Sequence, residues 1–408
     1  MRYQIITYGC QMNKSDSQRI SKVLESLGFS LSKNPDLTII NVCSVRQSAV
    51  DRAKSKAKQT KNKLLITGCI LQKDKKDFEK LSDALFNIND LSKLPEILKK
   101  LGFKIKKTDL KYKHYLELEP KYENQISAYV PIMTGCNNFC SYCVVPYTRG
   151  KEISRPTKEI ICEAKHLIKK GTKEIWLLGQ NVNSFKPSFP KLLKEVNNIP
   201  GKFWLRFTSS NPKDLTKQTI QIMANCEKIT PYINLPIQSG DNEILKAMNR
   251  PYTVEKYKQL IKELRKAFSQ PLAISTDVIV GFPGETKQQF NSTKKVFREI
   301  KFSFAYISRY SPRPGTRANK LKNNVSSQEK KQREKQLQEI VEATALEFNK
   351  QFVNKEIEAL VLKKTNNFFI GKTKYYQTIK FKAKDNLLGK FIQAKVTKAN
   401  PYGLEAKI

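Results

Sequence analysis

Short apolar runs alternate with helix-like repeats over the first quarter of the chain. Three of these runs end in a cysteine, at residues 4–10, 37–43 and 64–69. After the first run, apolar residues recur at the helical spacing, and Gly28 is placed to end that helix: Ile20, Val23, Leu24 and Leu27. Alternating strands and helices predict an open α/β sheet with parallel strands, which we assign to residues 1–107.

The middle of the chain repeats this alternation on a larger scale. Six runs read as strands, at residues 129–134, 173–178, 203–208, 231–236, 272–280 and 303–309. Helical patterns lie between them, for example at 157–169 and 254–268. We assign residues 127–350 to this second α/β domain together with a helix that follows it, and residues 104–125 to a linker that shows no clear period.

A long polar helix is predicted from about residue 326 to 352. Ser326 and Glu329 read as a capping box at its start. Apolar residues at spacings of three and four give the helix a packing stripe: Leu337, Ile340, Val341, Ala345 and Phe348. Residues 353–408 then change to short alternating segments, which predict a small five-stranded β-barrel.

Composition adds a large positive charge. The chain has 75 Lys and Arg against 37 Asp and Glu, a net charge of +38. Such a surface favours a polyanion, because Lys and Arg gain by displacing counterions from phosphates. Drift toward AT-rich codons also raises Lys, so charge alone is a weak argument for nucleic acid.

The N-terminus lacks the apolar core of a signal peptide, and no apolar run approaches a membrane span. We therefore expect a cytoplasmic protein without membrane contact. Eight cysteines in a reducing compartment indicate metal binding rather than disulfides.

Cys136, Cys140 and Cys143 are the strongest chemical signal. Three thiolates spaced C-x3-C-x2-C are suited to hold three irons of a [4Fe–4S] cube and leave the fourth open. Zinc is the alternative, but a closed zinc site needs four ligands. The sequence offers no fourth Cys or His close by, so we favour iron–sulfur.

Cys10, Cys43 and Cys69 each follow a predicted parallel strand. In open α/β sheets ligands collect at the carboxyl ends of the strands, so these cysteines are expected to meet there. We interpret them as a second three-thiolate site rather than as small buried hydrophobes. Cys162 and Cys226 are left over, and Cys162 is expected to be buried in the 157–169 helix.

The segment from Gly135 to Gly150, which contains Cys136, Cys140 and Cys143, resembles the radical S-adenosylmethionine (SAM) methylthiotransferases, and within them the tRNA-modifying MiaB type. The motifs around Cys10, Cys43 and Cys69 are similar to the amino-terminal domain of that family. The resemblance covers the whole chain. It implies a partial (β/α)6 radical SAM barrel in the middle and a TRAM domain, an RNA-binding β-barrel, at the carboxyl end.

The resemblance also implies the SAM contacts. Polar motifs follow successive predicted strands of the barrel, where such barrels carry their chemistry. By the resemblance, Tyr142 lies against the adenine, and Gln180 and Gln238 approach the bound SAM. No acid–base catalytic residue is expected, since the cofactor carries radical chemistry.

The implied reaction needs two [4Fe–4S] clusters and two SAM molecules per turnover. One cluster reduces SAM to a 5′-deoxyadenosyl radical that abstracts hydrogen; the other holds a sulfur atom that a second SAM methylates. The implied substrate is C2 of N6-isopentenyladenosine at position 37 of tRNA, beside the anticodon. The alternatives are threonylcarbamoyl-adenosine in tRNA and an aspartate of a small-subunit ribosomal protein. A non-catalytic RNA-binding iron–sulfur protein is the alternative from another class.

The implied partners are tRNA, an electron donor and a sulfur source, with no stable protein partner. Cations and aromatics in the tail suggest RNA contacts through Lys372, Lys374, Tyr375 and Tyr376. The segment 371–377 departs from the usual family pattern, which leaves an ordinary charged barrel surface as the alternative there.

Overall fold

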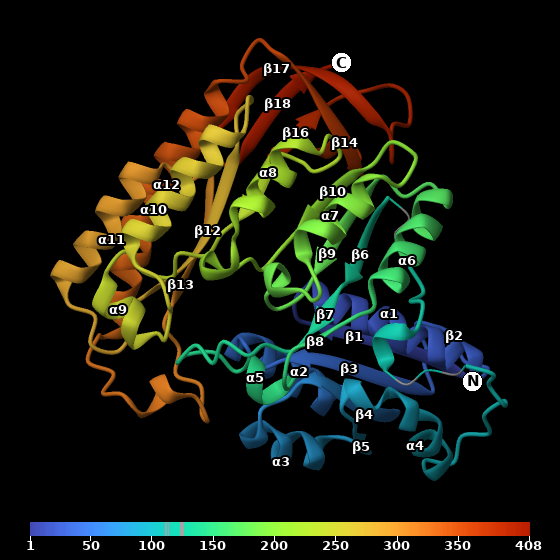
Figure 1. Ribbon diagram of the computed structural model, residues 1–408. Helices are drawn as coiled ribbons and strands as arrows, with labels where there is room; N and C mark the ends of the chain where they lie inside the picture. The colour runs from blue at the N-terminus through green and yellow to red at the C-terminus, as the bar shows by residue number, and fades with distance from the viewer. Residues whose placement is uncertain (111, 113, 123–125) are drawn as a thin grey trace.

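The computed structural model describes residues 1–110, 112, 114–122 and 126–408 (Figure 1). The first sheet is parallel, with strand order β2-β1-β3-β4-β5. Its strands are β1 (Arg2–Tyr8), β2 (Ser30–Leu31), β3 (Leu37–Cys43), β4 (Lys63–Cys69) and β5 (Ala84–Leu85). Its helices are α1 (Gln11–Ser26), α2 (Gln47–Gln59), α3 (Gln72–Leu81) and α4 (Leu94–Lys100), the last preceded by the 3-10 helix η1 (Ile88–Lys93). This confirms the predicted open α/β sheet.

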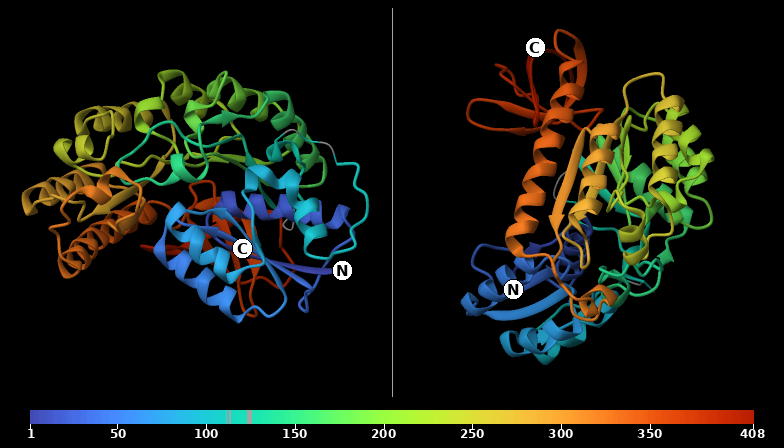
Figure 2. Two further views of the ribbon diagram at one scale, coloured as in Figure 1. Left: turned by 90° about the horizontal axis from the view of Figure 1, so that it is seen from below. Right: turned by 90° about the vertical axis from the view of Figure 1, so that its left-hand side faces the viewer.

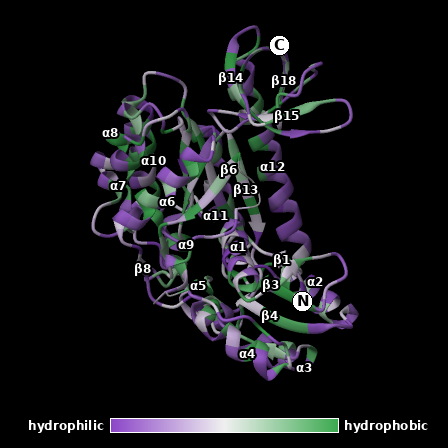
Figure 3. Ribbon diagram, turned by 90° about the vertical axis from the view of Figure 1, so that its right-hand side faces the viewer, coloured by the Kyte–Doolittle hydropathy of each residue, from purple (hydrophilic) through white to green (hydrophobic). Residues whose placement is uncertain are grey.

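The apolar runs form the centre of that sheet because their side chains are buried on both faces. All seven residues of β3 are buried, and Figure 3 shows hydrophobic residues along β3 and β4. Gly28 follows α1 with a φ of 91°, a conformation that glycine adopts without strain and that ends the helix as expected.

The middle domain is a partial barrel built from two parallel three-stranded sheets. The first has the order β10-β9-β6 and the second β11-β12-β13. A parallel bridge between Leu205 and Ile229 joins them. The strands are β6 (Ser127–Pro131), β9 (Glu174–Leu178), β10 (Trp204–Phe207), β11 (Tyr232–Asn234), β12 (Ala273–Val280) and β13 (Phe304–Arg309). These match the six predicted strands in order.

Helices cover the outside of this barrel (Figures 1 and 2). They are α6 (Thr157–Lys169), α7 (Phe189–Asn197), α8 (Lys217–Asn225), α9 (Asn242–Ala247), α10 (Val254–Ala267) and α11 (Lys287–Ile300). The short strands β7 (Met133–Thr134) and β8 (Ile153–Ser154) pair with each other and enclose the loop that carries Cys136, Cys140 and Cys143, together with α5 (Val145–Thr148). A further 3-10 turn, η2 (Tyr115–Glu117), belongs to the linker.

Helix α12 (Ser327–Lys350) runs along the central domain toward the carboxyl-terminal barrel (Figure 2). Its predicted capping box is only half formed. The Ser326 hydroxyl accepts the Glu329 amide at 3.1 Å, but the Glu329 carboxylate pairs with Arg333 Nε at 2.9 Å. Arg333 in turn binds the buried Glu285 at 2.6 Å, so the ion pair with the barrel draws Glu329 away from the cap.

The tail is a closed five-stranded barrel with the order β14-β15-β16-β18-β17, as predicted. Its strands are β14 (Glu356–Lys364), β15 (Phe369–Thr373), β16 (Thr378–Phe381), β17 (Phe391–Asn400) and β18 (Gly403–Lys407). Over the described residues, the structure contains no helix long and apolar enough to cross a bilayer.

Candidate cluster-binding sites

The loop with Cys136, Cys140 and Cys143 begins at a backbone position that requires glycine. Gly135 has a φ of 80°, and a Cβ there would lie 2.0 Å from the Lys151 carbonyl oxygen. The Cys136 amide donates to the Gly150 carbonyl at 3.2 Å, which closes the loop. The spacing of the three cysteines is therefore held within one short closed segment.

The connection from α9 to α10 clamps this loop. The Asn249 side-chain amide donates to the carbonyls of Asn138 and Phe139 at 3.2 and 3.0 Å. Arg250 Nη1 donates to Cys140 Sγ at 3.4 Å, and Asn138 Nδ2 donates to Cys136 Sγ at the same distance. Two of the three sulfurs thus already have a hydrogen-bond donor.

The three predicted SAM residues lie at the carboxyl end of the barrel or beside it. Tyr142 packs against an apolar group of buried residues: Ile244, Met248, Phe282, Tyr310 and Ala318. Gln238 has a φ of 68° and extends the pairing of β11 with β12 through its backbone, since its amide donates to the Asp277 carbonyl at 2.9 Å. The roles of these residues toward SAM remain predictions.

Gln180 lies among side chains that lack partners. Gln180 Oε1, Asn181 Oδ1 and Ser210 Oγ are buried without a hydrogen-bond partner in the described structure. They follow β9 and β10, and β9 pairs with β6, the strand that leads toward the cysteine loop. Buried polar atoms are normally paired, so three unpaired ones in the loops after two adjacent strands favour a polar ligand there. This arrangement fits the amino-acid end of SAM.

Cys10, Cys43 and Cys69 lie at one edge of the first sheet, as predicted. Cys43 and Cys69 are register partners on neighbouring strands, and Cys10 follows the next strand, β1. Gly68 permits this approach, because its φ is 113° and a Cβ would lie 2.1 Å from the Val42 carbonyl oxygen. Cys43 and Cys69 are buried, whereas Cys10 is exposed.

A network of buried amides supports Cys10. The Cys10 amide donates to Asn13 Oδ1 at 3.3 Å, and Asn13 Nδ2 donates to Asn41 Oδ1 at 3.0 Å. Asn41 Nδ2 donates back to the Asn13 carbonyl at 2.9 Å and to Ser17 Oγ at 3.0 Å. These bonds fix the start of α1, and with it Cys10, against β3.

Arg149 reaches the site of Cys10, Cys43 and Cys69 from the central domain. Its Nε donates to Cys69 Sγ at 3.0 Å, and its Nη2 pairs with Asp16 Oδ2 at 2.6 Å. Its Nη1 lies 3.4 Å from the Tyr115 hydroxyl of the linker. Arg149 and Asp16 are both buried. One side chain therefore joins three segments at a cysteine.

The pKa values of the thiols are shifted in different directions, even within one site. A hydrogen bond from Cys43, together with the charge of Arg149, lowers the pKa of Cys69, while the same hydrogen bond and burial raise the pKa of Cys43. Burial raises the pKa of Cys143 to about 12. Since metals bind thiolates, loading either site must release protons.

Both sets of cysteines can be compared with the geometry of a single-ion site. Among the described residues, no three Cys, His, Asp or Glu side chains converge on one metal position. The two sets fit clusters by residue type, three thiolates each, and by the donors that face their sulfurs.

The four predicted RNA-binding residues lie where the carboxyl-terminal barrel meets the central domain. The Tyr376 ring packs at 5.1 Å from Trp176 and 4.7 Å from Tyr232, and Tyr375 is buried. Lys372 Nζ lies 4.3 Å over the Tyr376 ring, and burial lowers its pKa to about 8. Lys374 Nζ donates to Gln270 Oε1 at 2.6 Å. Tyr375 and Tyr376 are therefore not placed to stack on RNA bases.

Buried Arg206 holds this interface together. It pairs with Glu174 at 2.7 Å and donates to the Thr373 and Lys374 carbonyls at 2.8 and 3.0 Å. On the open side of the barrel, Lys380 Nζ lies 3.8 Å over the Phe368 ring. Lys374, Tyr375 and Tyr376 lie in the turn between β15 and β16, and the sequence pattern does not show that this turn is docked against the central domain.

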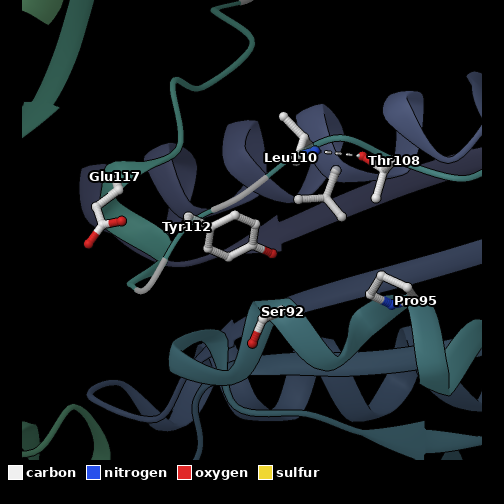
Figure 4. Close-up of a pocket in the computed structure, with 7 residues that line it drawn as sticks. Ser92, Pro95, Thr108, Leu110, Tyr112 and Glu117 are labelled. Carbon is white, nitrogen blue, oxygen red and sulfur yellow. Dashed lines mark hydrogen bonds between the residues drawn. The ribbon is translucent and has the colours of Figure 1, made fainter.

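Two further features lie outside both sites. The prediction that Cys162 is buried is wrong: it is exposed on α6. A cavity of about 580 Å³ lies between α1, α4 and the linker (Figure 4). Its described lining contains no cysteine, lysine or arginine: Val23, Ser92, Pro95, Thr108, Leu110, Tyr112 and Glu117. It is therefore unsuited to hold a cluster or a phosphate.

Sequence reasoning missed the arginines that contact sulfur. Arg149 follows Cys143 by six residues in the conspicuous segment Pro146–Gly150, and this proximity was the available signal. Its partner Asp16 is far away in sequence, and Arg250 reaches Cys140 from a different helix connection. The docking of the first domain on the central domain brings Asp16 to Arg149, whereas the fold of the central domain itself brings Arg250 to Cys140.

Comparison with known proteins supports three domains. The Radical SAM superfamily model matches residues 130–297, the uncharacterized protein family UPF0004 matches residues 2–88, and the TRAM domain matches residues 350–408.

Solved structures share the fold. The radical S-adenosylmethionine methyltransferase TsrM from Kitasatospora setae matches with a TM-score of 0.58 and 13% identity, over 78% of this chain and 75% of its own. The cobalamin-dependent S-adenosylmethionine radical enzyme OxsB matches with a TM-score of 0.54 and 10% identity, over 86% and 56%.

Sequence relatives match over the entire length. The tRNA-2-methylthio-N(6)-dimethylallyladenosine synthases of Alkaliphilus oremlandii and Caldicellulosiruptor saccharolyticus are 37% and 39% identical, each over 100% of this chain and 92% of the relative. That of Clostridium novyi is 39% identical over 100% of this chain and 96% of its own. The chain therefore belongs to the tRNA-2-methylthio-N(6)-dimethylallyladenosine synthase family.

Proposed function

We propose that this protein is a radical SAM enzyme that adds a methylthio group to C2 of N6-isopentenyladenosine at position 37 of tRNA. The observation that carries the proposal is the pair of three-cysteine sites within a chain related to these synthases along its whole length. One site lies at the carboxyl ends of the parallel strands β1, β3 and β4, and the other lies in the loop between β7 and β8. A single-cluster enzyme would have no use for Cys10, Cys43 and Cys69.

Family membership brings SAM and a [4Fe–4S] cluster to the central domain. With the cluster bound, SAM yields a radical strong enough to take hydrogen from an unactivated C–H bond. Cys136, Cys140 and Cys143 hold that cluster, and the clamp from Asn249 and Arg250 fixes the loop. Gln180, Asn181 and Ser210 offer unpaired polar atoms to the amino-acid part of SAM, and Tyr142 and Gln238 complete its surroundings.

Cys10, Cys43 and Cys69 hold a second [4Fe–4S] cluster, which carries the sulfur to be inserted, and each turnover uses two SAM molecules. Asn13 and Asn41 orient Cys10 toward this cluster, while Arg149 orients Cys69. An electron donor and a sulfur source act with the enzyme. We place it in the cytoplasm, with domain boundaries at 1–107, 127–350 and 353–408.

The anticodon loop of tRNA binds to the protein surface, and the net charge of +38 favours this contact with phosphates. Within the carboxyl-terminal barrel, the exposed Lys380 and its neighbour Lys382 flank the Phe368 ring at 3.8 and 5.4 Å. This group suits stacked bases and phosphates better than the docked Tyr375 and Tyr376 do. Lys372 and Lys374 lie at the interface between the carboxyl-terminal barrel and the central domain, and they contact RNA only at the edge of that interface.

The test is a substrate comparison with anaerobically reconstituted protein. Three substrates are offered with SAM and a reductant: tRNA bearing isopentenyladenosine, tRNA bearing threonylcarbamoyl-adenosine, and the small-subunit ribosomal protein with its aspartate. Mass spectrometry should find a methylthio product from the first alone. Product from either of the others instead would assign the alternative substrate. SAM cleavage without product from any of them would contradict the proposal.

A further inference from the structure

The contact between Arg149 and Cys69 crosses a domain boundary. Arg149 follows α5 in the central domain, whereas Cys69 ends β4 of the first sheet. The guanidinium uses three nitrogens on three partners, at 3.0 Å to sulfur, 2.6 Å to Asp16 and 3.4 Å to the Tyr115 hydroxyl. The first sheet alone would leave Cys69 without this donor.

Stability does not account for this arrangement. Arg149 and Asp16 are both withdrawn from water, and a buried ion pair is often no more stable than apolar residues of the same size. Asp16 Oδ1 is even left without a partner among the described residues. The pair is therefore a costly way to pack this space, and its position against a sulfur suggests another role.

Hydrogen bonds and charge at the sulfurs are what set the reduction potential of an iron–sulfur cluster. We propose that Arg149 is a positioning residue for the cluster on Cys10, Cys43 and Cys69, and that Arg149 and Asp16 together set its reduction potential. This inference rests on the proposed function, because it presupposes a cluster at that site.

The proposal predicts effects of opposite sign. Arg149→Gln removes the positive charge and the donor and leaves the Asp16 carboxylate next to the cluster, so the reduced state becomes harder to form. Asp16→Asn leaves the positive charge of Arg149 uncompensated, so the reduced state becomes easier to form. A residue with a merely structural role would disturb the site in one direction for both variants.

The experiment uses the full chain with Cys136, Cys140 and Cys143 replaced by Ala. In this parent protein, a cluster is able to bind only at Cys10, Cys43 and Cys69. Iron and sulfide are counted, and the midpoint potential is followed by electron paramagnetic resonance. Arg149→Gln should shift it to more negative values, Asp16→Asn to more positive values, and Arg149→Lys should shift it less than Arg149→Gln.

Glu163→Gln is the matched control. Glu163 is a buried carboxylate at the same domain boundary, paired with Arg155 at 2.6 Å and Arg19 at 3.7 Å, and its ion pairs contain no sulfur in the described structure. It should leave the potential unchanged. Equal potentials in Arg149→Gln and the parent, or a control that reproduces the shift, would overturn the inference.

The outcomes also separate this inference from the proposed function. If the parent itself binds no iron, the proposed function is contradicted in its claim that Cys10, Cys43 and Cys69 hold a cluster. If Arg149→Gln binds no iron while the parent does, the midpoint potential of Asp16→Asn becomes the test. A more negative or unchanged potential in Asp16→Asn would then overturn the inference.

Discussion

Replacing Arg206 with Met tests how the carboxyl-terminal barrel is attached to the central domain. Arg206 is 1% exposed, and its partner Glu174 is 2% exposed. Breaking a buried ion pair by removing one partner costs about 3–5 kcal/mol, because the remaining charge is uncompensated. The Lys374 carbonyl oxygen also loses its donor, which adds roughly 1–3 kcal/mol if no water reaches it. The expected loss of unfolding free energy is therefore at least about 3 kcal/mol.

The chain carries its own probe for this interface. It has 2 tryptophans, Trp176 and Trp204, and the Arg206 guanidinium carbon lies 5.5 and 5.1 Å from their rings. Urea denaturation followed by tryptophan fluorescence thus reports on the region that the substitution changes. A double variant, Glu174→Gln with Arg206→Met, buries no lone charge and should recover part of the loss.

Lys202→Gln serves as the control at the same interface. Lys202 pairs with Glu358, but its side chain is 67% exposed. An exposed pair contributes less than about 1 kcal/mol. If Arg206→Met lost no more stability than Lys202→Gln, the reasoning about the buried pair would be refuted.

Three further predictions concern glycine, pH and RNA. Gly68→Ala places a Cβ against the Val42 carbonyl and should reduce the bound iron by about half, the share of one of two clusters, while Gly171→Ala, which has a φ of 93° in open space, should not. Lys372 has a folded pKa of about 8 against 10.5 when unfolded. The unfolded state therefore holds its proton more tightly, and stability should rise between pH 8 and pH 10.5 in the parent by more than in Lys372→Met, measured by urea denaturation at each pH. Lys380→Gln with Lys382→Gln should weaken tRNA binding and reduce its salt dependence by about 1–2 in the slope of log K against log salt, and an unchanged slope would exclude them as phosphate contacts.

The fold was largely predictable because its signals are local. Each strand of the two α/β domains is a short apolar run, and a cysteine directly after such a run must lie at the sheet edge. The parallel pairing of β3 with β4 then brings Cys43 opposite Cys69.

What the sequence did not reveal depends on contacts and competing partners that only the fold supplies. Tyr376 lies in a polar segment near Lys374 and Gln377, as a surface residue would, yet it packs on Trp176 from another domain. Arg149 and Arg206 look like ordinary surface cations until the fold supplies Asp16 and Glu174. Glu329 fits a capping box by spacing, but Arg333 competes for its carboxylate.

The most direct test of the two-cluster account is a paired assay on Cys43→Ala. The loop with Cys136, Cys140 and Cys143 is local in sequence, so it should bind its cluster even when the site of Cys10, Cys43 and Cys69 is disrupted. Radical formation should therefore continue. The account predicts 5′-deoxyadenosine by chromatography and no methylthiolated adenosine in tRNA by mass spectrometry of the same sample. Methylthiolated product from Cys43→Ala would contradict the account.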